Sequence, residues 1–260
     1  MNDMTGRMQG KVVAITGTGG GMGRAAALRF SKEGAIIAGC DVNLEANQET
    51  KRLVELAGGQ MHASAPVNLV EELATKDWLT QVEKDLGKID VLYANAGVTK
   101  FNKIEDVTLE EWRFVMQHEL DIVFLPVKYA WEALKKSQGN IILVGSTAGV
   151  SGSVTNNRIA HSTTKGGVIS MARQLAAEGS KYGIRANSIS PGMIRTPATE
   201  GDLLAPNHPM AKIAQHIPLG RIGTVDEVVN CALFLASDEA SYVTGANLMV
   251  DGGWSAVLPG

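Results

Sequence analysis

Residues 16–23, TGTGGGMG, have the composition of a turn that binds phosphate groups. Gly17, Gly21 and Gly23 permit a tight turn, a close approach of the backbone to a pyrophosphate, and close packing of a helix on a strand. A helix that begins at this turn presents unpaired N–H groups to the phosphates. A merely flexible turn has a similar composition, so the pattern predicts a dinucleotide site only where a strand precedes it and a helix follows.

An acidic residue supports the same chemistry. Asp41 lies 18 residues beyond Gly23, at the end of the expected second strand. A carboxylate there can accept hydrogen bonds from the adenosine ribose hydroxyls, and it repels a 2′-phosphate. No Lys or Arg occupies positions 18–20, and Val42 follows the acid. The sequence therefore predicts NAD rather than NADP; the alternative for Asp41 is a solvated turn residue.

Short apolar runs alternate with longer helical patterns, and this order of elements would position such a turn. We expect strands at 11–16, 35–40, 60–65, 89–94, 140–144 and 184–189, helices at 22–33, 44–56, 71–85, 109–136 and 159–182, and a final helix and strand within 225–250. Continuous apolar strands separated by helices indicate a parallel sheet covered on both faces. The predicted fold class is α/β, a single doubly wound Rossmann domain over residues 1–260 with a mostly parallel seven-stranded sheet and helices on both faces.

The composition excludes several classes of protein. Of the 260 residues, 45% are hydrophobic and 20% are charged, as in an ordinary globular domain, and the net charge of −3 gives no support for a nucleic-acid partner. No apolar run approaches the roughly 20 residues that a membrane span requires, and residues 1–10 lack the apolar core of a secretory signal. We expect a cytoplasmic protein in which Cys40 and Cys231 are reduced core residues.

With these features in place, the sequence resembles the short-chain dehydrogenase/reductase superfamily over nearly the whole chain. The segments that carry the resemblance are the glycine pattern at 16–23, NAG at 95–97, SPGMIRT at 190–196, PLGR at 218–221 and YVTGANLMVDGG at 242–253. The resemblance implies that backbone groups around Pro191 and Gly192, and the side chain of Thr196, fix the nicotinamide carboxamide. The NAD-binding residues that it implies are Gly17, Thr18, Gly21, Met22, Gly23, Asp41, Val67, Asn95, Ala96, Gly97, Lys165, Pro191, Gly192, Ile194 and Thr196.

The catalytic residues depart from the family's usual set of Asn, Ser, Tyr and Lys. Ser146 and Lys165 match the family's serine and lysine. His161 stands four positions before Lys165, where the family has tyrosine, and Glu119 stands where the asparagine is expected. The interval from Ser146 to His161 is longer than usual, and Pro66 replaces an aspartate that contacts adenine in many relatives.

The altered set can still move a proton. Imidazole exchanges its proton near neutral pH, so a neutral His161 can act as a general base on a hydroxyl or a carbon-bound proton. By the resemblance, Ser146 would hydrogen-bond the substrate oxygen, and Lys165 would bind the nicotinamide ribose and tune His161. Glu119 would orient the imidazole, relay its proton or pair with Lys165. The alternatives are a plain strand-end serine, an inert histidine, a core lysine, and a surface or misaligned carboxylate.

Three functions remain open at this point. The first is an NAD(H)-dependent oxidoreductase that transfers a hydride between nicotinamide and a secondary alcohol or ketone. The second is a lyase, isomerase or dehalogenase on the same scaffold, in which His161 and Glu119 perform acid/base chemistry. The third is a non-catalytic NAD-binding protein, for which loss of the tyrosine is the natural sign.

Residues 191–218 contain several prolines and are expected to form a mobile substrate loop. Apolar side chains in this segment predict a hydrophobic body for the small-molecule substrate, with simple packing of the loop on the domain as the alternative; they are Met193, Leu203, Leu204, Pro209 and Met210. The resemblance implies a homotetramer or homodimer formed through the helices at 109–136 and 159–182. The five histidines are scattered, and no spacing of Cys, His and acidic residues predicts a metal site.

Overall fold

The computed structural model describes residues 6–64 and 66–257, and its centre is a sheet of seven parallel strands. The strands, in the order in which they lie across the sheet, are β3 Gln60–Ser64, β2 Ile36–Cys40, β1 Val12–Thr16, β4 Val91–Ala94, β5 Asn140–Val144, β6 Arg185–Pro191 and β9 Asn247–Val250. The predicted doubly wound α/β fold is confirmed. Residue 65, the expected end of the third strand, lies outside the described residues.

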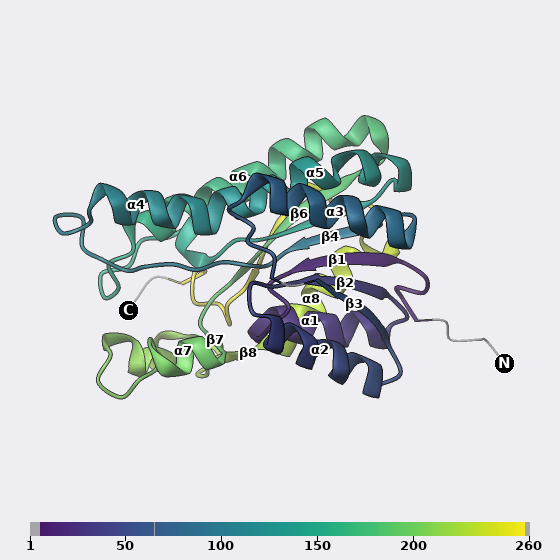
Figure 1. Cartoon of the computed structure of the whole chain (residues 1–260). Coiled ribbons are helices and arrows are strands. Elements are labelled where there is room, and N and C mark those ends of the chain that lie inside the picture. Colours follow the sequence, from purple (N-terminus) through teal and green to yellow (C-terminus); the bar gives the residue numbers. More distant parts are fainter. Residues whose placement is uncertain (1–5, 65, 258–260) are drawn as a thin grey trace.

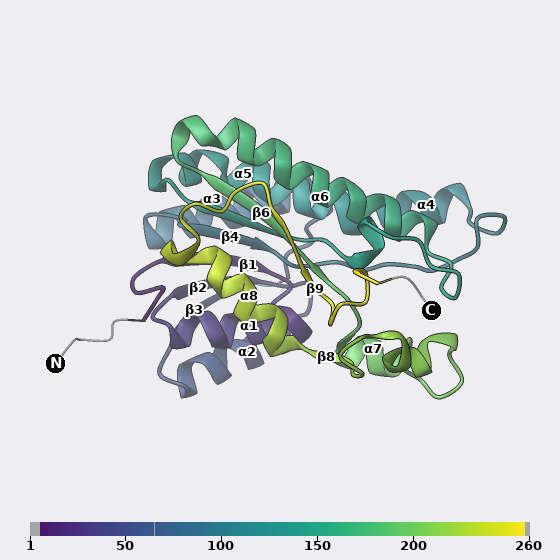
Figure 2. The ribbon, with the colours of Figure 1, turned by 180° about the vertical axis from the view of Figure 1, so that it is seen from behind.

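Helices cover both faces of this sheet (Figures 1 and 2). One face carries α3 Glu72–Leu86, α4 Leu109–Met116, α5 Ile122–Ser137 and α6 Ile159–Gly179, and the other carries α1 Gly21–Lys32, α2 Leu44–Leu56 and α8 Val225–Ala236. The central strands β1, β4 and β5 are almost entirely apolar because both of their faces are covered. In β1, Val12 and Ala14 belong to the core beneath α3, α5 and α6. The alternate residues Val13 and Ile15 belong to the core beneath α1 and α8.

The helix expected at 109–136 contains a change of helical type in its middle. Between α4 and α5 the chain forms a π-helical turn, Gln117–Asp121. Such wider turns occur mostly as single turns within α-helices and are frequent at functional sites. Glu119 lies in this turn, and its side chain is only 3% exposed. The structure therefore excludes the alternative in which Glu119 is a surface carboxylate.

Residues 191–218, expected to form a mobile loop, contain short regular elements. The segment contains β7 Ile194–Arg195, α7 Pro197–Gly201 and a 3₁₀ helix Pro209–His216, and β7 pairs with β8 Gly223–Thr224. Its apolar side chains pack on one another in a small core made of Met193, Met210, Ile213 and Ile217, with Leu203, Leu204, Ile222 and Trp254 packed against it. These side chains are used to fold the segment, so they no longer support a hydrophobic substrate.

The turn between β1 and α1 depends on its glycines. Gly17 and Gly21 have φ values of +75° and +50°, in the left-handed region that side chains other than glycine rarely adopt. Gly23 has no unusual φ, but a Cβ atom there would overlap the carbonyl oxygen of Gly17. Gly20 differs from its neighbours, since its backbone is extended and a Cβ would meet nothing within 4 Å.

This contrast gives a matched pair of variants. Gly23→Ala should destabilise the protein by about 2 kcal/mol or more, because the added methyl group must displace backbone rather than a flexible side chain. Gly20→Ala should leave the free energy of unfolding nearly unchanged. Urea denaturation of both variants measures the difference, and equal stabilities would contradict this account of the turn.

Candidate active site

The carboxyl ends of β1 and β4 meet at one edge of the sheet and hold the glycine turn in place. The Asn95 N–H donates to the Thr16 hydroxyl at 2.9 Å, and the Asn95 side-chain amide donates to the Thr16 carbonyl at 3.0 Å. The Ala96 N–H also donates to the Thr16 hydroxyl, at 3.0 Å. As a result, Asn95 and Ala96 supply the atoms nearest to the position that a Gly17 Cβ would occupy. The predicted NAG segment therefore supports the turn directly.

Asp41 lies beside this turn, as the sequence predicts. One carboxylate oxygen accepts from the Gly19 N–H at 2.8 Å, and the other accepts from the Asn43 N–H at 2.9 Å. The Val67 N–H donates to the Asp41 carbonyl at 2.9 Å, which brings Val67 to the same place. Backbone groups thus fix the carboxylate at the end of β2, next to the start of α1.

Thr18 in the glycine turn and Arg24 in α1 have roles that the sequence did not reveal. The Thr18 side chain is buried and donates to Asn47 Oδ1 at 2.6 Å, so it braces the turn from behind. Arg24 donates from Nη2 to the Gly19 carbonyl at 2.6 Å and from Nε to the Thr50 hydroxyl at 2.9 Å. Arg24 and Asp41 therefore contact the same residue, Gly19, one through its carbonyl and the other through its N–H. Positions 18–20 hold no cation, because Arg24 reaches this residue from the first turn of α1.

The segment that follows β6 also lies against the glycine turn. A Cβ atom on Gly21 would lie 3.9 Å from the Thr196 methyl group. Thr196 also caps α7, since its hydroxyl accepts from the Thr199 N–H at 3.1 Å. Pro191 ends β6, and Gly192 packs so closely on Asp251 that a Cβ would come within 2.8 Å of its Cα.

These neighbours fit a nicotinamide dinucleotide. The glycine turn leaves an approach free of side chains at the N-terminus of α1, and Met22 and Gly23 continue into that helix. Asp41 would lie at the adenosine end of such a ligand, and the segment of Ile194 and Thr196 would lie toward the opposite end.

Lys165 joins the expected cofactor site to the catalytic residues. Its Nζ donates to the Val144 carbonyl at 3.0 Å and lies 3.8 Å from the position of a Gly97 Cβ. Burial lowers the pKa of Lys165 below its usual value, and the charge of Glu119 acts in the opposite direction. Lys165 is therefore a buried cation at the ends of β4 and β5, and not a solvated lysine.

Ser146 lies next to this lysine in space. Val144, which accepts from Lys165, is two residues before it, and a Cβ on Gly149 would lie 2.6 Å from the Lys165 backbone carbon. The Ser146 hydroxyl oxygen accepts from the Ala148 N–H at 3.1 Å, which leaves the hydroxyl proton available to a substrate oxygen. Among the described residues, no hydrogen bond joins Ser146 to His161 directly.

Glu119 and His161 form the central contact of the site. His161 Nδ1 is 2.7 Å from Glu119 Oε1 and 2.9 Å from Oε2, and the Thr164 hydroxyl donates to Oε2 at 2.6 Å. Burial alone would raise the pKa of Glu119. The hydrogen bonds from His161 and Thr164 and the positive charge of Lys165 outweigh burial, so the pKa lies below its usual value.

This geometry assigns the protons. An ionised carboxylate can only accept hydrogen bonds, so His161 Nδ1 carries the proton that faces Glu119. Nε2 is then the nitrogen left to accept a proton from a substrate, as in a histidine oriented by a buried carboxylate in a catalytic triad. Phe101 packs edge-on against the imidazole, with ring centres 5.5 Å apart and an interplanar angle of 83°. The imidazole is only 14% exposed and is held from two sides.

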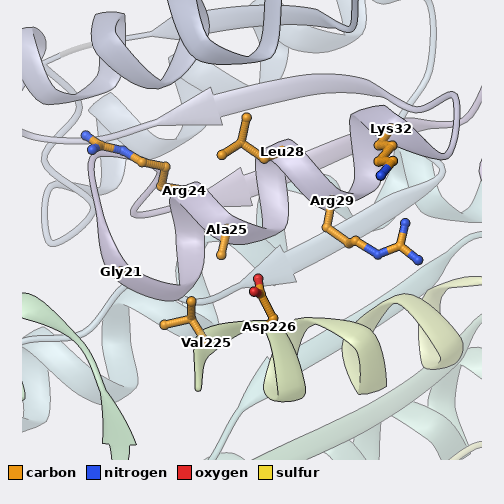
Figure 3. Close-up of a pocket in the computed structure, with 8 residues that line it drawn as sticks. All are labelled: Gly21, Arg24, Ala25, Leu28, Arg29, Lys32, Val225 and Asp226. Carbon is orange, nitrogen blue, oxygen red and sulfur yellow. The ribbon is translucent and has the colours of Figure 1, made fainter. Parts of the chain in front are cut away.

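A hollow of about 400 Å³ lies between α1 and α8 (Figure 3). Arg24 points away from Asp226 in this view, and its guanidinium donates to the Gly19 carbonyl in the glycine turn. Arg29 is engaged with Glu33 and Asn230. The hollow lies on the face of the sheet opposite α6, so it is separate from the His161 site.

The remaining expectations concern metals, membranes and thiols. Within the described ranges, no three His, Cys, Asp or Glu side chains gather where they would hold a metal ion. None of the helices in that part of the chain combines the length and the hydropathy of a membrane-spanning segment. Neither cysteine forms a disulfide within the described residues; Cys40 is a buried core residue as predicted, whereas Cys231 is only half-buried at the edge of the core.

Comparison with known proteins agrees with this architecture. The family model described as enoyl-(acyl carrier protein) reductase matches residues 17–255. Meso-2,3-butanediol dehydrogenase of Serratia marcescens is 36% identical over 250 residues, covering 96% of each chain. A 3-oxoacyl-(acyl-carrier-protein) reductase of Thermotoga maritima is 36% identical over 251 residues, covering 95% of this chain and 98% of the relative. The crystal structure of levodione reductase superposes with a TM-score of 0.91 at 32% identity, over 96% of this chain and all of that one.

The fold and the glycine turn define a dinucleotide-binding α/β protein. The chain belongs to the short-chain dehydrogenase/reductase superfamily. Its relatives are dehydrogenases and reductases, which supports an enzyme of the same type.

Two residues of the site were missed by the sequence reasoning. Thr164 follows His161 by three positions, a spacing that places both on one face of a helix, so the pattern could have indicated it. Phe101 lies far from His161 in the sequence and carries no local signal.

The buried carboxylate predicts a pH-dependent stability difference. Because the folded-state pKa of Glu119 lies below its ordinary value of 4.5, its charge stabilises the fold fully above that value, and this contribution disappears as the pH falls through the folded-state pKa. Glu119→Gln should therefore cost about 2 kcal/mol at pH 7 and progressively less below pH 4.5. Urea denaturation of the unaltered protein and of Glu119→Gln, from pH 7 to below pH 4.5, measures the difference in their free energies of unfolding. A difference that does not change with pH would contradict a buried, ionised Glu119.

Proposed function

We propose that this protein is an NAD(H)-preferring dehydrogenase or reductase of secondary alcohols and ketones, in which a histidine–glutamate pair replaces the family's catalytic tyrosine. The observation that carries the proposal is the contact of 2.7 Å between His161 Nδ1 and the buried carboxylate of Glu119. An inert substitution in a degenerate site would not need a buried, ionised partner, because burying a carboxylate is costly unless its hydrogen bonds are satisfied.

Each residue has a distinct task in this mechanism. The Ser146 hydroxyl donates to the substrate oxygen and fixes its position. His161 Nε2 takes the proton from the alcohol, or returns it to the ketone oxygen, while Glu119 stabilises the imidazolium that forms. Lys165 supplies a buried positive charge at the ends of β4 and β5, where the nicotinamide ribose would bind.

The cofactor supplies one function when bound, which is to accept or deliver a hydride at the nicotinamide ring. The glycine turn, Asp41 and Thr196 would hold it. Phe101 beside the imidazole would exclude water from the reacting carbon, and it offers an apolar wall to the carbon next to the alcohol.

Replacement of His161 tests the mechanism. His161→Ala should lower kcat by roughly 10²-fold or more, with little change in NAD affinity, because the base acts on the substrate. Appearance of NADH with a panel of secondary alcohols is the assay, and His62→Ala, at an exposed histidine on β3, is the matched control. Full activity in His161→Ala would require the mechanism to be abandoned.

A second set of variants tests whether positions 119 and 161 act together. His161→Tyr alone places a phenol beside the Glu119 carboxylate, which opposes formation of the phenolate that the usual family mechanism needs. The double variant Glu119→Asn with His161→Tyr restores the usual set and should be the more active of the two, with its rate displaced to higher pH. A redox-neutral enzyme would instead lose its reaction in both.

Cofactor preference gives an independent test. NADH should bind more tightly than NADPH, because a 2′-phosphate would lie against the Asp41 carboxylate. Asp41→Ala removes that repulsion and keeps the Arg24 cation. The ratio of NADH affinity to NADPH affinity should therefore fall by about tenfold, which corresponds to 1.4 kcal/mol. Titration calorimetry measures both cofactors, and Asp226→Ala, an exposed acid on α8, serves as the control. Tighter binding of NADPH to the unaltered protein would refute the proposed preference.

We also propose a homotetramer or homodimer. Support comes from two large apolar side chains on the α4–α5 layer, Leu109 and Phe124, which are 62% and 49% exposed. Light scattering should return a multiple of the monomer mass, and a monomer at micromolar concentration would contradict the proposal.

A further inference from the structure

Arg158, the residue immediately before α6, carries a charge that the described residues do not neutralise. No carboxylate in that part of the chain lies within ion-pair distance of its guanidinium. Among the described residues, the guanidinium donates one hydrogen bond, a long one from Nη2 to the Ser151 carbonyl at 3.3 Å. The Nε atom is buried and has no acceptor.

This arrangement is unfavourable for the protein on its own. Partial burial lowers the pKa of Arg158, since the charged form loses water without gaining an anion. The position adds to the cost, because a cation at the start of a helix faces the positive end of the helix dipole. The other part-buried arginines, Arg24, Arg29 and Arg185, each donate to two or more oxygen acceptors. Arg158 alone among these four has an orphaned, buried donor.

Arg158 is also placed close to the catalytic residues. The Ser162 N–H donates to the Arg158 carbonyl at 2.8 Å, which closes the first turn of α6. His161 is three residues after Arg158, so the first turn of α6 separates the two residues. The acceptor residue Ser151 is bonded through its own hydroxyl to the carbonyl of Thr147, the residue that follows Ser146. The guanidinium thus connects the loop after Ser146 to the turn that carries His161.

We propose that Arg158 binds a carboxylate of the substrate, so that the enzyme acts on a small hydroxy acid or oxo acid. This inference rests on the proposed function, since it names the class of substrate for the same site. The planar guanidinium matches a carboxylate in a two-point contact, and an acceptor at Nε would satisfy the orphaned donor. The contact would hold the substrate about one helical turn from His161 Nε2, with the alcohol carbon near Phe101.

A carboxylate fits better than a phosphate. Arg158 is the only Lys or Arg between Ser146 and Lys165, and Lys165 is already bonded at the strand ends. One cation balances the single charge of a carboxylate, whereas a phosphate monoester carries up to two charges and is usually held by several donors.

Binding can be measured without turnover. Pentanoate, pentanamide and methyl phosphate would be titrated into the protein with NAD present, by calorimetry. Pentanoate should bind at least tenfold more tightly than the neutral amide or methyl phosphate. Arg158→Met should remove that preference without changing the binding of pentanamide, and Arg158→Lys should retain part of it. Arg52→Met is the matched control, because Arg52 is exposed on α2 and paired with Glu49.

Thermal unfolding separates a ligand-binding role from a structural one. Without a carboxylate present, Arg158→Met should melt at the same temperature as the unaltered protein or higher, because methionine keeps an apolar stem and removes an unpaired charge. Pentanoate should raise the melting temperature of the unaltered protein but not that of Arg158→Met. A lower melting temperature for Arg158→Met, with unchanged affinity for pentanoate, would overturn the inference in favour of a structural role.

Oxidation assays with hydroxypentanoates and with their methyl esters show whether the carboxylate site or the proposed oxidoreductase activity has failed. If the esters are oxidised with dependence on His161, and pentanoate binds no better than pentanamide, the carboxylate site is wrong and the oxidoreductase stands. If pentanoate binds through Arg158 and no alcohol is oxidised, the carboxylate site stands and the oxidoreductase is wrong. Tighter binding of methyl phosphate than of pentanoate would overturn the choice of carboxylate.

Discussion

The burial of one negative charge, that of Glu119, constrains much of the structure around the site. A carboxylate removed from water is tolerated only when its oxygens are hydrogen-bonded and its charge is balanced. His161, Thr164 and Lys165 meet these needs, two through hydrogen bonds and one through its charge. Their spacing of three and four residues places all three on one face of α6. The π-helical turn between α4 and α5 holds the carboxylate opposite that face.

The consequence for chemistry is that the two departures from the family pattern are a single change. A histidine without the carboxylate would have no fixed tautomer, and a buried carboxylate without the histidine would lack its principal donor. Together they form a pair whose free nitrogen, Nε2, has a defined direction. Thr164 supports the pair by donating a further hydrogen bond to Glu119 Oε2.

On the cofactor side of the molecule the glycine turn and Asp41 keep the family pattern, and Pro66 is the one departure named above. The glycine turn is braced by Asn95, Ala96 and Thr18, and Asp41 is fixed by backbone N–H groups. These contacts are formed at the carboxyl edge of the sheet by strands that are neighbours in space. The expected dinucleotide site and the His161–Glu119 pair are therefore separate groups of residues. Lys165 lies between them, since its Nζ touches the end of β5 and its position is one helical turn after His161.

The sequence by itself determined the elements and the cofactor edge, because strand and helix periodicities and a glycine turn are local patterns. It also identified the positions of Ser146, Glu119, His161 and Lys165 through the family resemblance. Only the tertiary structure decided that Glu119 contacts His161, since the two are 42 residues apart and lie on different helices. The same holds for Phe101, for the folding of residues 191–218 around their own small core, and for the unpaired guanidinium of Arg158. Each depends on which side chains from distant segments reach one another, and that is settled by the packing of helices on the sheet and not by any local pattern.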